Sequence, residues 1–101
     1  MKVETSHHID ASEPDADGMH EWHYEYELYR FSDGGVSLVA RSYVEEPEQA
    51  HFINADVGGA ARLITKRELT QPLFVEALAY LRRAGKTRIE LLGVEGYTSI
   101  P

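Results

Sequence analysis

Within residues 21–31, EWHYEYELYRF, large apolar side chains alternate with His23, Glu25 and Glu27. Every second position is aromatic or aliphatic: Trp22, Tyr24, Tyr26 and Leu28. A period of two is that of an extended chain, and aromatic side chains favour a pleated surface. This segment therefore predicts a β-strand, and the chain must build a sheet around it.

A turn follows this strand at once. Ser32-Asp33-Gly34-Gly35 contains two dipeptides that supply the positive φ of a tight hairpin. We expect a second strand over residues 36–44 to run back and to end before Pro47, which cannot donate to a ladder. With Asp33-Gly34 as the turn, Phe31 faces Val36, whereas with Gly34-Gly35 it faces Leu38. Both registers place the same residues on the same face.

The hairpin therefore has two distinct faces. One face carries Tyr29, Phe31, Val36, Leu38 and Ala40. The other carries Trp22, Tyr24, Tyr26, Leu28, Arg30, Val39, Arg41 and Tyr43. A single helix covers only one of them, and the sequence does not say which.

The rest of the chain adds a third strand, a helix and a last strand. Residues 49–54 and 86–92 have strand character, while residues 93–101 read as irregular. Arg62–Thr65 is either a fourth short strand or the approach to the helix. Thr70 is a good N-cap, an apolar stripe of the helix includes Phe74, and Gly85 is the expected stop. The prediction is an α+β fold in two layers: a mainly antiparallel sheet of 3–5 strands with one main helix on one face, in the order β-β-β-α-β.

Residues 1–20 are polar and acidic and show no periodicity. Such a segment buries too little apolar area to offset its ordering entropy, so we expect a disordered acidic tail over 1–20 and a single α+β domain over 21–101. The first residues contain no apolar run typical of a signal peptide, and no segment is apolar enough for a membrane span. Together with the absence of cysteine, these features favour a cytoplasmic protein with no membrane association.

The sequence indicates no catalytic residue, metal site or cofactor. The histidines at 7, 8, 20 and 23 lie near aspartates, but most fall in the expected tail, which lacks the fixed geometry of a zinc site. Ala84–Thr87 resembles the end of a phosphate-binding loop, yet the required upstream glycine is missing and the order of helix and strand is reversed. A net charge of −7 disfavours binding to nucleic acid.

Six residues are the candidate binding site: Trp22, Tyr24, Tyr26, Arg30, Arg41 and Tyr43. Tyr, Trp and Arg are enriched at the centres of protein interfaces, although such side chains also pack within ordinary cores. The function we expect is a small protein-interaction or regulatory module that acts through this aromatic and arginine-rich face, as a homodimer or with a protein partner. One alternative is a binder of a small ligand or single-stranded nucleic acid on the same face, with Arg30 and Arg41 contacting anions. Another is a small enzyme with a carboxylate or histidine site, although the residues favour a protein without enzymatic activity.

Overall fold

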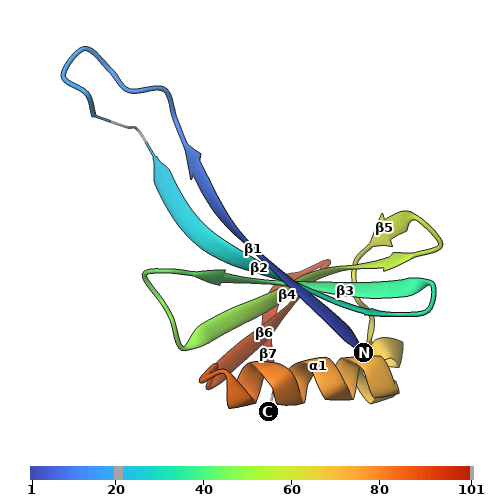
Figure 1. Cartoon of the computed structure of the whole chain (residues 1–101). Coiled ribbons are helices and arrows are strands. Elements are labelled where there is room, and N and C mark those ends of the chain that lie inside the picture. Colours follow the sequence, from blue (N-terminus) through green and yellow to red (C-terminus); the bar gives the residue numbers. More distant parts are fainter. Residues whose placement is uncertain (20–21, 101) are drawn as a thin grey trace.

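The computed structural model describes residues 1–19 and 22–100, in which seven strands form one sheet packed against one α-helix (Figure 1). The elements are β1 (Lys2–Ala11), β2 (His23–Asp33), β3 (Val36–Tyr43), β4 (Gln49–Val57), β5 (Ala60–Arg62), the 3-10 helix η1 (Lys66–Thr70), α1 (Pro72–Arg83), β6 (Arg88–Gly93) and β7 (Gly96–Ile100). Glu21, at the start of the predicted strand, lies outside the described residues, as do His20 and Pro101.

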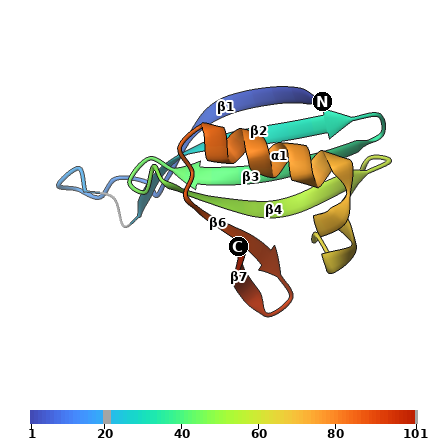
Figure 2. The same cartoon turned by 90° about the horizontal axis from the view of Figure 1, so that it is seen from below.

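The strands lie in the order β1-β2-β3-β4-β6-β7, and β5 pairs with β4. Neighbouring strands are antiparallel except β4 and β6, which are parallel and are connected through η1 and α1. Seen from below, α1 crosses the sheet on one side only, over β2 and β3 (Figure 2). No helix of the described residues lies on the opposite side of the sheet (Figure 1).

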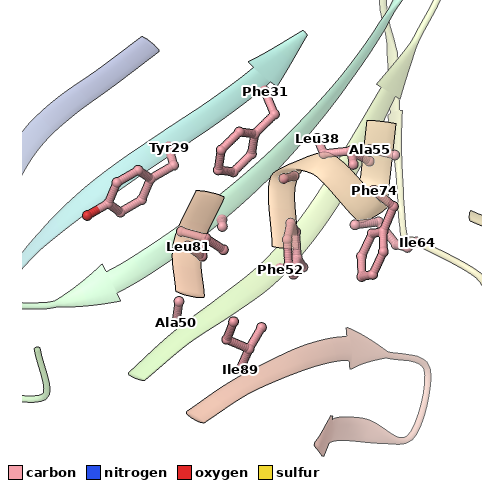
Figure 3. Close-up of a cluster of buried hydrophobic side chains, with 12 residues drawn as sticks. Tyr29, Phe31, Leu38, Ala50, Phe52, Ala55, Ile64, Phe74, Leu81 and Ile89 are labelled. Carbon is pink, nitrogen blue, oxygen red and sulfur yellow. The ribbon is translucent and has the colours of Figure 1, made fainter. Parts of the chain in front are cut away.

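The predicted hairpin is confirmed, and its register is the one with Gly34 and Gly35 in the turn. Phe31 pairs with Leu38, and Gly34 has a φ of +63°, the left-handed region that favours glycine. The face with Tyr29 and Phe31 is the one that α1 covers. Figure 3 shows these side chains meeting Phe52 of β4 and the helix residues around Phe74.

The helix begins at Pro72, two residues after the predicted cap at Thr70. Proline is suited to the first helical position because its missing N–H has no intrahelical partner there. The Thr65-x-x-Glu68 capping box also forms, but it caps η1 rather than α1. Arg62 ends β5 and residues 63–65 lead into η1, so the Arg62–Thr65 segment is mostly connection rather than strand. Gly85, with a φ of +92°, follows the helix as predicted.

The predicted sheet of 3–5 strands in the order β-β-β-α-β is wrong, because the sheet has seven strands. Two of the additional strands lie where irregular chain was expected. β1 occupies much of the segment predicted as a disordered tail and pairs with β2 along its whole length, and β7 occupies the segment after Gly93. Both lie at the ends of the strand order. A strand in such a position is held by its ladder on one side while its side chains stay largely exposed, so it needs no alternating hydrophobic pattern.

Candidate functional site

The sheet face opposite α1, called the open face below, gathers most of the candidate residues. Its central side chains are Tyr24, Tyr26, Arg41, Tyr43, His51 and Tyr97. Strand register brings them together: Tyr26 pairs with Tyr43 across β2 and β3, and Arg41 pairs with His51 across β3 and β4. Side chains directly opposite one another across two strands are close enough to interact.

Arg41 lies at the centre of this face and is held by three tyrosines. Its guanidinium carbon is 5.0 Å from the ring centroid of Tyr43 and 5.8 Å from that of Tyr26. Its Nη2 donates a hydrogen bond to the Tyr97 hydroxyl at 3.2 Å. A guanidinium within about 6 Å of a ring centroid gains a cation–π attraction. These contacts restrict the Arg41 side chain in the folded chain.

The tyrosines also contact one another and extend the cluster toward β1. The ring of Tyr43 lies 5.9 Å from Tyr24 and 5.8 Å from Tyr26, the latter in an edge-to-face arrangement. On the other side of Tyr26, the imidazole of His8 stacks on the ring at 5.4 Å. These separations are those at which aromatic pairs stabilise each other. The result is a continuous aromatic row across β1, β2 and β3.

His51 extends this aromatic row into β4, and its side chain is buried. Its ring lies 4.7 Å from that of Tyr97, and its Nδ1 lies 3.1 Å from Glu90 Oε1 without a hydrogen bond. Gln49 Nε2 donates to the same Glu90 oxygen at 2.7 Å. Burial lowers the pKa of His51 below its usual 6.5, against the opposing effect of Glu90. His51 is therefore a neutral, buried ring at pH 7.

A hollow of about 310 Å³ lies at the margin of the open face. Its lining consists of aromatic and acidic side chains with one histidine: His23, Tyr24, Glu25, Tyr43, Glu45 and Glu46. Ring faces and carboxylates both attract positive charge. The hollow is therefore suited to a cationic group. Within residues 1–19 and 22–100, no group of three or more histidine or acidic side chains is arranged to hold a metal ion.

The structure brings together four of the six predicted residues: Tyr24, Tyr26, Arg41 and Tyr43. Arg30 lies further along β2, where its Nη1 is 3.9 Å from Asp56 Oδ2. Trp22 lies just before β2, where its carbonyl accepts a hydrogen bond from the Ser12 N–H, and its side chain is about half exposed.

Sequence reasoning missed three members of the row: His8, His51 and Tyr97. His8 was assigned to the tail and Tyr97 to an irregular segment. His51 was placed in the correct strand but without partners, because the pairing of Arg41 with His51 depends on a register between β3 and β4 that includes a bulge. For β7, a signal was present: Gly96 favours a turn, and Tyr-Thr-Ser-Ile after it is rich in strand-forming residues.

No helix within the described part of the chain is long and apolar enough to cross a membrane. Comparisons of this chain with protein-family models, curated proteins and solved structures give no match.

Proposed function

We propose that the protein is a small interaction module that binds a partner protein through the open face. The observation that carries this proposal is the cluster of Tyr24, Tyr26, Arg41 and Tyr43 on the side of the sheet that α1 does not cover. Tyrosine and arginine are the residue types that contribute most to binding at the centres of interfaces. Tyr24 and Tyr97 are about half exposed, at 51% and 46%, and so offer ring surface to a partner.

The fixed position of Arg41 favours binding. An exposed arginine normally loses side-chain freedom when it enters an interface, which weakens association. Here the rings of Tyr26 and Tyr43 and the hydroxyl of Tyr97 already restrict it. Much of the ordering entropy is therefore lost on folding rather than on binding.

The partner we propose presents a basic side chain to the hollow between Tyr24 and Tyr43. Three glutamates line that hollow, and the whole chain has a net charge of −7. A lysine or arginine placed there meets two ring faces and several carboxylates at once. The open face of a second copy brings its own glutamates rather than a basic group to this hollow, so we assign the open face to a different protein.

The same contacts do not favour binding of nucleic acid or of an anionic ligand. Arg30 is next to Asp56, and Arg41 is held among tyrosines. Glutamates line the adjacent hollow, where they repel phosphate. An enzyme has equally little support, since His51 is buried within the row rather than placed in a cleft.

Peptide binding tests this proposal. A panel of lysine- and arginine-containing peptides, with acidic peptides of equal length, is titrated against the labelled protein at low salt. We expect selective binding of basic peptides. Tyr43→Ala should weaken that binding by at least about tenfold, as for an interface residue whose truncation costs about 1.4 kcal/mol or more. Val75→Ala, on the exposed side of α1, is the matched control and should leave binding unchanged.

Amide chemical shifts locate the binding surface independently. On addition of a bound peptide, the shifts should concentrate on residues of β2 and β3 around Tyr24 and Tyr43. If no basic peptide binds, or if Tyr43→Ala binds as well as the folded wild-type protein, the proposal is wrong.

A further inference from the structure

The outer edge of β1 is a second surface, independent of the open face. β1 is ten residues long and stands at one end of the strand order, so no other strand of the described chain pairs with its outer side. Figure 2 shows it at the rim of the sheet, beside β2. A sheet edge presents unpaired N–H and C=O groups in a regular row, which is a template for another strand.

The register of β1 shows which backbone groups form this row. The Ser12 N–H donates to the carbonyl of Trp22, and the pairing of β1 with β2 continues without a bulge down to Lys2. Hydrogen-bonded pairs alternate along an antiparallel ladder, so the even-numbered residues of β1 bond to β2. Val3, Thr5, His7 and Ile9 therefore turn their N–H and C=O groups outward.

The side chains of β1 are complementary to β1 itself when one copy is reversed. With Ser6 on a two-fold axis, Lys2 lies opposite Asp10 of the second copy. Glu4 lies opposite His8, and Val3 lies opposite Ile9, which is 63% exposed in the single chain. Lys2 thus lies opposite a carboxylate, Glu4 lies opposite an imidazole, and the apolar residues lie opposite each other.

Geometry strengthens this match. The pairs that contain charges are the non-hydrogen-bonded ones, in which the side chains approach more closely. Lys2 Nζ already lies 3.1 Å from Glu4 Oε1 within one chain, so each lysine lies between Glu4 of its own chain and Asp10 of the other copy. His8 is held in place by its stacking on Tyr26 and by a 2.7 Å contact with Ser6 Oγ.

Neighbouring registers lack this complementarity. A shift by two residues in one direction places Glu4 opposite Asp10. A shift in the other direction places Lys2 opposite His8 and removes the pair of Lys2 with Asp10. A shift by one residue moves the side chains of the second copy to the other face of the sheet. A single register is therefore favoured over its neighbours by charge.

We propose that the protein forms a two-fold symmetric dimer by antiparallel pairing of β1 with β1 of a second copy. The pairing adds about eight backbone hydrogen bonds, two for each of the outward-facing pairs. It joins two sheets into one, with both α1 helices on one side and both open faces on the other. The dimer thereby presents two open faces side by side.

Sedimentation velocity over a wide range of concentration is the first test, and we expect a reversible dimer that weakens with added salt. Thr5→Pro removes an outward N–H without removing a bond to β2, so it should leave a folded monomer. Thr5→Val retains that N–H and is the matched control, which should still dimerise. Tyr43→Ala should also dimerise, because the open face takes no part in this contact.

Charge reversal then tests the register. Asp10→Lys places two lysines opposite each other and should weaken the dimer by about tenfold or more. Adding Lys2→Asp restores opposite charges and should recover most of the lost affinity. A monomer at the highest concentration, a dimer that Thr5→Pro does not affect, or a charge swap that fails to recover affinity would each overturn the proposal.

Discussion

Glu68 offers the most direct test of the energetics of this fold. Glu68 lies within η1 and its carboxylate is almost fully buried. It accepts hydrogen bonds from the Thr65 N–H at 2.9 Å, from the Thr65 hydroxyl and from Arg62 Nη2. Burial by itself raises the pKa of Glu68, but the bonds from Thr65 and Arg62 outweigh it and lower the pKa from 4.5 to about 2. The charged form is therefore the one that stabilises the fold.

The size of this effect follows from the two pKa values. A change from 4.5 to about 2 corresponds to about 3 kcal/mol of unfolding free energy at neutral pH. The side chain of Arg62 is 47% exposed, and solvent screens its share of the interaction. We therefore expect about 1 to 3 kcal/mol for the loss of the charge in Glu68→Gln.

The lowered pKa of Glu68 makes the stability of the fold depend on pH in a distinctive way. Because the folded state holds Glu68 ionised more strongly than the unfolded state does, its stabilisation is present above about pH 5 and is lost as the pH falls toward about 2. Urea unfolding of the wild type and Glu68→Gln at a series of pH values measures the difference. The unfolding free energies of the two proteins should differ clearly at pH 7 and should converge as the pH approaches about 2.

Glu76→Gln is the control, since Glu76 lies exposed on α1. Its stability should follow that of the wild type closely at every pH. A constant separation between the wild type and Glu68→Gln from neutral to acid pH would refute the electrostatic account, because a purely steric effect does not titrate.

Three further outcomes are expected. Phe52→Ala removes a fully buried ring of β4 that packs against Phe74 of α1. Urea unfolding should show an unfolding free energy lower by about 3–5 kcal/mol. Burial lowers the pKa of His51 below 6.5 in the folded state, so the unfolding free energy should fall as the pH is lowered from about 6.5. His51→Gln should reduce this dependence of the melting temperature on pH in thermal unfolding. Removing residues 1–19 deletes β1 and uncovers the edge of β2, so the melting temperature in calorimetry should drop by several degrees, whereas a disordered tail would leave it unchanged.

The hairpin shows how much the sequence alone determined. The period of two over residues 21–31 and the Asp-Gly-Gly turn identify β2, β3 and the residues that share each face, because both signals are local. The parity of the side chains is the same in either register, so Tyr24, Tyr26 and Tyr43 had to lie on one face with Arg41. The helix and its stop at Gly85 follow in the same way from local pattern and local turn chemistry.

Only the tertiary structure decided which face α1 covers and which strands complete the sheet. β1 and β7 lie at the two ends of the strand order and are held mainly by ladder bonds to β2 and β6, and their largely exposed side chains give no alternating hydrophobic pattern. The contacts of His8 and Tyr97 with the tyrosine cluster depend on those strands. Elements were thus predictable where hydrophobic periodicity carries the information, and were missed where backbone pairing holds a strand whose side chains are largely exposed.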